Sequence, residues 1–165
     1  RIDWAAGNWA RAIDRAHAAR EQAPDSRAAG TTLAWMLLSA PDGALQDVRR
    51  ALAVIRQGSA ESDHPNVLEV RAALAAGEGR MRVAKSLALD AARVARDRGA
   101  TPYAQALEAQ ANVYQQGRPF RESVESARHR LMKGAWVGLP PRGSANWLTS
   151  VGRSTSGALN SAADP

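Results

Sequence analysis

The chain has 165 residues, of which 45% are hydrophobic, so it is long enough to bury a core within one domain. Aromatic residues make up only 5%, which predicts a thin interior. The absence of cysteine excludes disulfides, thiolate nucleophiles and thiolate metal sites. The sequence has no signal peptide and no apolar run near the length of a membrane span. Because it begins at Arg1 and not at methionine, we expect a processed chain or a fragment, which a signal or an anchor could precede.

The net charge of +6 is distributed unevenly along the chain. Residues 1–116 carry 15 basic and 13 acidic side chains, whereas residues 117–165 carry 7 basic and 3 acidic ones. The carboxy-terminal third is therefore the basic part. A basic surface can bind nucleic acid, anionic lipid or an acidic protein, and charge alone does not choose among them.

The chain before residue 67 is predicted to form three full helices separated by turns. Pro24 ends the first helix, because the residue before a proline is pushed out of the helical region. Ser26 is a suitable cap for the second helix, and Gly43 lies in the turn that follows it. Residues 58–66 form a polar loop. The predicted helices cover residues 8–23, 27–39 and 47–57, after a short helical stub at residues 1–6.

A helical hairpin is predicted next, over residues 65–94, with room for its second helix to run on to residue 98. In its first helix small or apolar residues recur at a helical spacing, and glycines then break it; in its second helix, from residue 81, alanines recur every three or four positions. Methyl-sized side chains let a neighbouring helix approach closely. A unit of two helices cannot bury its own apolar face, so the hairpin implies similar neighbours on both sides. The residues concerned are Leu68, Ala72, Ala75 and Ala76, then Gly77 and Gly79, then Ala84, Ala88, Ala91 and Ala95.

Two further helices are predicted before the composition changes. A closing helix runs to Gln116, with Thr101 as a plausible cap and Pro102 at its first position. A charged helix follows at residues 121–133. From Gly134 the chain is rich in Gly, Ser, Pro and Ala, which is typical of a linker or an extended arm.

A glycine, then a bulky residue and three alanines recur at one spacing in two parts of the chain. The two sets are Gly7, Trp9, Ala12, Ala16 and Ala19, and Gly79, Met81, Ala84, Ala88 and Ala91. This pattern resembles the second helix of a tetratricopeptide repeat, and 72 residues separate the two glycines, close to two periods of about 34. Residues 31–57, with LAW followed by a Pro-Asp turn, resemble a divergent repeat of bacterial tetratricopeptide proteins. The resemblance covers roughly residues 3–122.

The resemblance implies an all-α fold: a right-handed, tetratricopeptide-like solenoid of helical hairpins over residues 1–133. Residues 134–165 are then an extended carboxy-terminal arm. We expect its apolar residues to dock on this solenoid or on another subunit, as anchors of an interface. These arm residues are Trp136, Leu139, Trp147, Leu148 and Val151.

In this family the first helix of each repeat lines a concave groove, and the resemblance places a set of residues near it for partner binding. Trp35 and Tyr114 are aromatic contacts for a partner in this interpretation. The alternative is that Trp35 packs under the turn at Pro41 and that Tyr114 packs onto the closing helix. The groove residues are Thr31, Trp35, Leu38, Glu69, Tyr114 and Gln115.

A cluster of basic residues surrounds the predicted last helix. Stacking aromatics are not interleaved with the arginines, and Glu122 and Glu125 interrupt them, so nucleic-acid binding is not favoured. A solvated helix face, or one that meets an acidic subunit, fits better. The basic patch consists of Arg118, Arg121, Arg128, Arg130 and Lys133.

The chemistry-bearing residue types do not form a recognisable catalytic or metal-binding motif. His17, His64 and His129 lie apart in the sequence, without a second histidine or a carboxylate cluster beside them. No serine stands in a nucleophile elbow, and no glycine-rich phosphate loop follows a strand. We therefore expect no catalytic residue, no metal and no cofactor.

The favoured function is that of a non-enzymatic scaffold or assembly subunit, whose partners are protein subunits of a larger complex. Nucleic acid is not the expected partner, and membrane association would come through partners or a preceding anchor. The resemblance favours a bacterial protein that is periplasmic or membrane-associated. Two alternatives stay open: an accessory repeat module of a larger enzyme, such as a membrane glycosyltransferase, and a binder of RNA or anionic lipid.

Overall fold

All regular secondary structure in the described part of the chain is helical, which confirms the all-α prediction. The computed structural model describes residues 2–58 and 63–132, and these ranges contain no strand. In chain order the elements are α1 (Ile2–Ala5), α2 (Trp9–Gln22), α3 (Arg27–Ser39), the short 3-10 helix η1 (Gly43–Leu45), α4 (Val48–Gly58), α5 (Pro65–Gly77), α6 (Met81–Asp97), α7 (Thr101–Gln115) and α8 (Val124–Met132).

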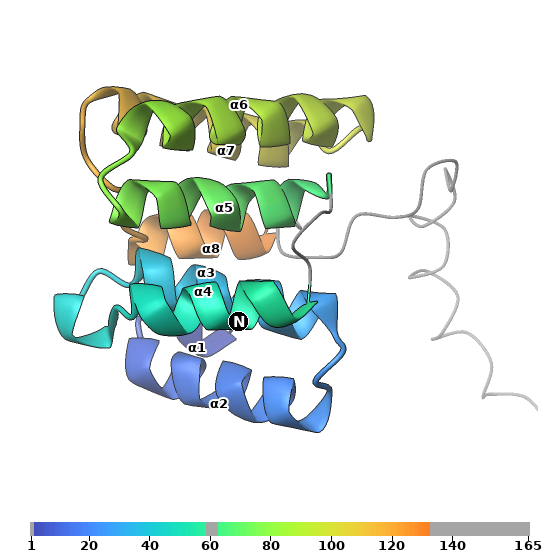
Figure 1. Cartoon of the computed structure of the whole chain (residues 1–165), viewed down its shortest axis with the longest axis vertical. Coiled ribbons are helices and arrows are strands. Elements are labelled where there is room, and N and C mark those ends of the chain that lie inside the picture. The colour runs from blue at the N-terminus through green and yellow to red at the C-terminus, as the bar shows by residue number, and fades with distance from the viewer. Residues whose placement is uncertain (1, 59–62, 133–165) are drawn as a thin grey trace, which may run out of the picture.

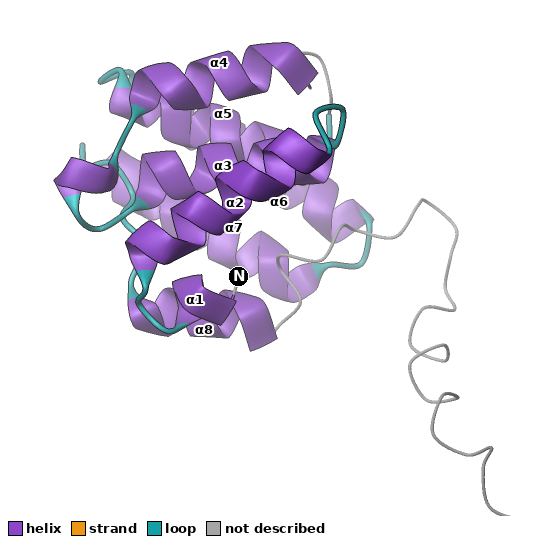
Figure 2. Ribbon diagram, turned by 90° about the horizontal axis from the view of Figure 1, so that it is seen from below, coloured by secondary structure: helices purple, strands orange, loops and turns teal. Residues whose placement is uncertain are grey.

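Helices that follow one another in the chain pack against one another. The closest packing is between α6 and α7, α5 and α6, and α3 and α4, and α3 also packs on α2 and α5 (Figure 1). The result is a stack that runs from α2 at one end to α6 and α7 at the other. Helix α8 departs from this order: it turns back and lies beside α1, as Figure 2 shows. The two ends of the described chain therefore lie together.

Glycine residues end four of the helices by adopting a left-handed backbone. Gly7, Gly79, Gly99 and Gly117 have φ between 73° and 81° and follow α1, α5, α6 and α7 respectively. Residues with a Cβ are strained at such angles, which explains why glycine stands at these turns. The left-handed turn predicted after residue 76 is thus made by Gly79. Gly77 remains within α5.

Side-chain caps fix where several helices begin, and two predicted starts were wrong. Ser26 caps α3 as predicted, by accepting a hydrogen bond from the Ala29 amide. Thr101 is already the first residue of α7 and gives no cap. The last helix begins at Val124 and not at residue 121, because Ser123 and Ser126 each accept a hydrogen bond from the other's backbone amide.

The alanine stripe predicted on the second helix of the hairpin is buried. Ala84, Ala88, Ala91 and Ala95 of α6 are all fully buried, and they lie in the two clusters that α6 forms with α5 and α7. Helix α5 is buried on nearly all sides, which makes it the central helix of the stack. Small side chains thus let α5, α6 and α7 approach closely.

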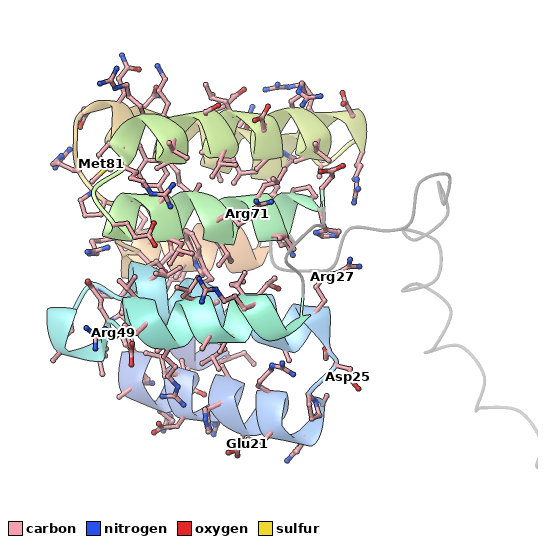
Figure 3. All side chains as sticks on the ribbon, viewed as in Figure 1. Glu21, Asp25, Arg27, Arg49, Arg71 and Met81 are labelled. Atoms are coloured by element: carbon pink, nitrogen blue, oxygen red, sulfur yellow. The ribbon has the colours of Figure 1, made fainter. Side chains whose placement is uncertain are left out.

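Charged residues cover the outside of the stack. Figure 3 shows Glu21, Asp25 and Arg27 near the turn between α2 and α3, and Arg49 and Arg71 on the outer side of α4 and α5. Arg71 is exposed although its neighbours on both sides are buried. None of the described helices combines the length and the apolar character that a membrane crossing requires.

Candidate functional site

The inner face of the stack is the surface that α3, α5 and α7 present to α8. We call the buried polar group that joins it to α8 the Arg130 cluster. Its members come from α3, α5, α7 and the segment that contains α8, and all are nearly fully buried. The Arg130 cluster consists of Trp35 on α3, Glu69 on α5, Tyr103 and Gln110 on α7, Glu122 before α8, and Arg130 on α8.

Glu69 is the acceptor at the centre of the cluster. Its carboxylate accepts hydrogen bonds from the Tyr103 hydroxyl, from Nε2 of Gln110 and from Nη1 of Arg130, each with a donor–acceptor distance of 2.6 Å. A buried carboxylate is costly unless donors satisfy it. Two of its donors sit on α7, and the third comes from α8. Glu69 therefore ties three helices together.

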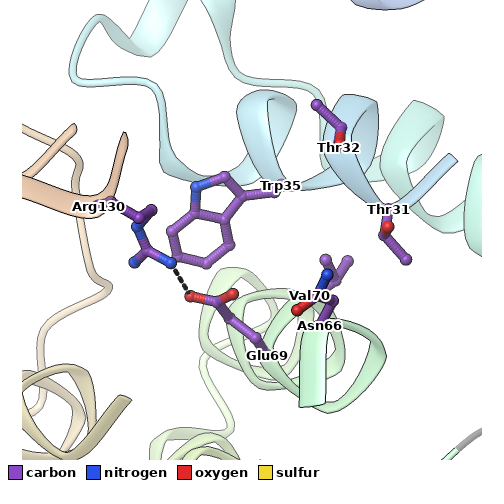
Figure 4. Close-up of a pocket in the computed structure, with 7 residues that line it drawn as sticks. All are labelled: Thr31, Thr32, Trp35, Asn66, Glu69, Val70 and Arg130. Carbon is purple, nitrogen blue, oxygen red and sulfur yellow. Dashed lines mark hydrogen bonds and ion pairs between the residues drawn. The ribbon is translucent and has the colours of Figure 1, made fainter. Parts of the chain in front are cut away.

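Arg130 makes a second ion pair and lies over an aromatic ring. Its Nε is 3.3 Å from Oε2 of Glu122, which also accepts a hydrogen bond of 3.2 Å from Nε1 of Trp35. The guanidinium carbon is 4.7 Å from the centroid of the Trp35 ring, a cation–π contact. Phe120 stacks on the same indole, with ring centroids 5.8 Å apart. Figure 4 shows Trp35, Glu69 and Arg130 pointing toward one another.

The electrostatics of the cluster hold Arg130 charged and Tyr103 neutral. Burial alone would lower the pKa of Arg130, but the carboxylates of Glu69 and Glu122 outweigh it and hold that pKa above its usual value. Burial, and then the nearby charge of Glu69, raise the pKa of the Tyr103 hydroxyl well above its usual value. Tyr103 therefore stays a hydrogen-bond donor to Glu69 across the physiological pH range.

The segment before α8 is attached to the carboxyl end of α3 by two hydrogen bonds to backbone carbonyls of α3. The amide of Glu122 donates to the carbonyl of Ser39 at 2.8 Å, and Nη1 of Arg121 donates to the carbonyl of Leu38 at 3.0 Å. The last carbonyls of a helix lack partners within it, so these donors satisfy α3. Helix α8 is also bonded to α1, because Nε of Arg128 donates to the carbonyl of Ala5 at 3.1 Å.

Two cavities border the Arg130 cluster. One of about 20 Å³ lies beside Trp35, between α3 and α5, and has room for about one water molecule. The other, of about 400 Å³, lies between α7 and α8. It is lined on the α7 side by Pro102, Gln105, Ala106 and Ala109, and on the other side by Phe120, Ser123, Glu125, Ser126 and Arg130.

Most of the predicted groove residues are buried in the structure. Thr31, Trp35, Leu38, Glu69 and Tyr114 are buried, and only Gln115 is exposed. Trp35 is buried rather than open to a partner, and its indole faces Phe120 and Arg130. Leu38 does not line the inner face; its side chain lies near Gly77.

The predicted basic patch does not form one surface. Arg130 was wrongly placed on a solvated face, since only 5% of it is exposed and it pairs with two carboxylates. Arg118 and Arg128 are exposed, and Arg121 reaches back to α3. Lys133 lies outside the described residues, as do the arm residues Trp136, Leu139, Trp147, Leu148 and Val151.

Sequence reasoning missed Tyr103, Gln110 and Glu122 as members of the cluster. In the sequence Glu122 is predicted only to interrupt the basic patch. A signal for its role was present, because Glu122, Ser126 and Arg130 recur every four residues and so fall on one side of a helical path. The hydroxyl of Ser126 indeed hydrogen-bonds to the carboxylate of Glu122. Tyr103 and Gln110 had no comparable local signal.

The described residues contain no group of three or more histidine, aspartate or glutamate side chains placed to hold a metal ion. Comparisons of the chain with models of known protein families, with curated proteins and with solved structures gave no significant match. The inner face buries Ala127 and Arg130 of α8 and pairs this arginine with Glu69.

Proposed function

We propose that the protein is a non-enzymatic scaffold or assembly subunit, built as a tetratricopeptide-like solenoid that holds protein partners on its inner, concave face. Support for the repeat interpretation comes from the order of packing. Helices α3 and α4, and α5 and α6, make two neighbouring pairs, with α7 packed on the last of them. The right-handed superhelix and the arm at residues 134–165 belong to the same proposal.

One observation carries the proposed function: the inner face already holds a helix. It binds α8 through the buried ion pair of Arg130 with Glu69 and through Ala127, which is only 1% exposed. Binding a helix on a preformed surface is a common mode of protein recognition, in which a few buried anchor residues supply most of the energy. A face with this chemistry suits a partner helix.

The alternative of RNA or anionic lipid binding through the basic end has less support. Arg130, in the middle of the predicted patch, forms ion pairs with Glu69 and Glu122. Phosphate binding needs several exposed cations acting together, and its strength falls steeply with salt. A protein partner is therefore the better proposal.

The experiment is affinity capture from extract with the tagged full chain and with a version that ends at Lys133, read by mass spectrometry. We expect the full chain to retain a protein at stoichiometric amount after nuclease treatment and in moderate salt. Retention by both versions assigns binding to the solenoid, whereas loss on truncation assigns it to residues 134–165. Recovery of only nucleic acid or lipid would refute the proposal.

A further inference from the structure

The feature that leads beyond a general scaffold is the way α8 sits on the inner face. It is the chain's own helix, and besides its packing on α1 and the hydrogen bond from Arg128 to the carbonyl of Ala5, it is held by one buried arginine and the small apolar contact of Ala127. We infer that the inner face binds a partner helix in place of α8, and that this helix presents an arginine to Glu69. The inference rests on the proposed scaffold function and names the chemistry of its partner.

The residues that stay behind when α8 leaves select for arginine. Glu69 keeps its hydrogen bonds from Tyr103 and Gln110, both on α7, and these hold its carboxylate in place. Trp35 offers the flat ring over which the guanidinium now lies at 4.7 Å. A guanidinium can donate to a carboxylate and stack on an indole at the same time, which a lysine ammonium does less well.

The inner face is larger than its present occupant. Helix α8 lies against α1, and between α8 and α7 lies the cavity of about 400 Å³, which α7 and α8 do not fill. On the α8 side this cavity is bordered by the small residues Ser123 and Ser126, and on the α7 side by Ala106 and Ala109. A partner helix with larger apolar residues beside its arginine would fill space that α8 leaves empty. Such a helix gains contact area that α8 lacks.

Helix α8 is suited to leave. It has only 9 residues, and isolated helices of fewer than about 12 to 15 residues are marginal in water, so its helical form depends on docking. It is the last element of the described chain, and of the other helices it packs most closely on α1. Because it is tethered, it competes at an effective concentration that reaches the millimolar range. A free ligand must overcome this competition.

The experiment uses a fluorescent peptide of residues 119–132, which is the docking segment itself, and the full chain. Its binding is measured by fluorescence anisotropy to the wild-type chain and to a chain carrying Arg130→Gln, in which α8 is held less firmly. Since the apparent affinity for a ligand is proportional to the fraction of molecules whose face is free, the variant should bind the peptide about tenfold more tightly or better. Equal weak binding to both chains would overturn the inference.

Matched changes in the peptide test the arginine. On the same helix Arg130 is buried between two carboxylates, whereas the exposed Arg128 gives one hydrogen bond to the carbonyl of Ala5, so a peptide with Arg128→Gln should lose no more than about threefold in affinity. A peptide with Arg130→Gln should lose at least about tenfold. If the two peptides lose affinity equally, the face recognises general positive charge and the inference is wrong.

A second chain variant tests the same displacement of α8 in case the Arg130→Gln chain does not fold. Ala127 is fully buried between α8 and the core, so Ala127→Leu should expel α8 by overpacking without changing any charge. We expect it to bind the wild-type peptide as tightly as the Arg130→Gln chain does, with the far-ultraviolet circular dichroism retaining the signal of α2 to α7. Failure of both variants to bind, with that signal retained, would overturn the inference.

Two further outcomes distinguish a partner helix on the inner face from a second copy of the chain and from a partner bound elsewhere. If the wild-type chain sediments as a dimer and the Arg130→Gln chain as a monomer, the occupant of the inner face is α8 of a second copy. This result would overturn the inference that the occupant is a helix of a different protein. The second outcome concerns a protein captured from extract that the peptide does not displace and that the Arg130→Gln chain does not enrich. Such a protein would support the scaffold function but would refute the inner face as its binding site.

Discussion

Nη1 of Arg130 on α8 lies 2.6 Å from Oε1 of Glu69 on α5, and the two side chains are only 5% and 7% exposed. The pair joins residues that are 61 positions apart in the chain. A buried ion pair contributes little net stability compared with apolar residues of the same shape, but removal of one partner leaves an uncompensated charge. Arg130 neutralises two carboxylates at once, because Nη1 pairs with Glu69 while Nε lies 3.3 Å from Oε2 of Glu122.

The first prediction concerns the energetic coupling of this pair. Glu69→Gln should lower the free energy of unfolding by about 1.5–3 kcal/mol, because Arg130, Tyr103 and Gln110 lose a charged acceptor. Combined with Arg130→Gln, the loss should be smaller than the sum of the single losses by about 1 kcal/mol or more. Urea unfolding followed by circular dichroism measures all three variants.

The control for the coupling is a surface pair of the same residue types. Glu108 and Arg96 form an ion pair in which the side chains are 41% and 51% exposed. Glu108→Gln should change the free energy of unfolding by less than about 1 kcal/mol. Additive losses at Glu69 and Arg130 would show that the two side chains do not act together.

Residues that repeat at a helical period were predictable from the sequence. The stripe that includes Ala84, Ala88 and Ala91 repeats every three or four residues and was assigned to a packing surface, and all three are fully buried. Local turn chemistry also sufficed for the end of the second helix and for the cap at Ser26. These features depend on neighbours within about one or two turns of helix, which a sequence displays directly.

The Arg130 cluster could not be predicted in the same way, because its contacts span 34 to 87 residues. Nothing local distinguishes the buried Arg130 from the exposed Arg128 two positions earlier. The return of α8 to α1 decides that difference, and tertiary packing sets it. For the same reason the sequence does not predict that Trp35 contacts Phe120, Glu122 and Arg130.

The second prediction concerns the backbone at Gly79. Its φ is +78°, and a Cβ added there would meet no atom within 4 Å, so any cost of substitution comes from the backbone alone. Gly79→Ala should lower the free energy of unfolding by about 1–2 kcal/mol. Gly79→Asn should cost less, because asparagine tolerates the left-handed region. Gly43, where a Cβ also meets nothing and φ is not positive, is the control, and Gly43→Ala should be nearly neutral in thermal unfolding.

The third prediction tests the close packing of α6. Ala88 is fully buried in a cluster that includes Ala72 of α5 and Tyr114 of α7. Ala88→Leu should lower the free energy of unfolding by about 1–3 kcal/mol, because the helices cannot separate locally without losing other contacts. The neighbouring Leu89 is 43% exposed, so Leu89→Ala should stay within about 0.5 kcal/mol of the wild type. Equal effects in chemical unfolding would mean that α6 is not packed as described.

The basis of the fourth prediction is His64, which was expected to be a solvated loop residue. Its Nδ1 accepts a hydrogen bond of 3.3 Å from the Asn66 amide, so the imidazole caps the start of α5. Burial, and then the charges of Arg98 and Arg27, lower the pKa of His64 from 6.5 to about 4. The cap also requires Nδ1 to carry no proton, which agrees with this direction.

The lowered pKa of His64 sets the sign of a pH effect on stability. Between pH 6.5 and about 4 the unfolded chain binds a proton at His64 that the folded chain does not, so the free energy of unfolding falls as the pH falls. The contribution is fully present above pH 6.5 and lost below about 4, and because His64 is only half-buried we expect it to be on the order of 1 kcal/mol. His64→Asn keeps an acceptor for the Asn66 amide and removes the titration, so urea unfolding across this window should show a flatter pH dependence. His17→Asn, at an exposed site on α2, is the matched control, and a His64→Asn curve that runs parallel to the wild-type curve would refute the assignment.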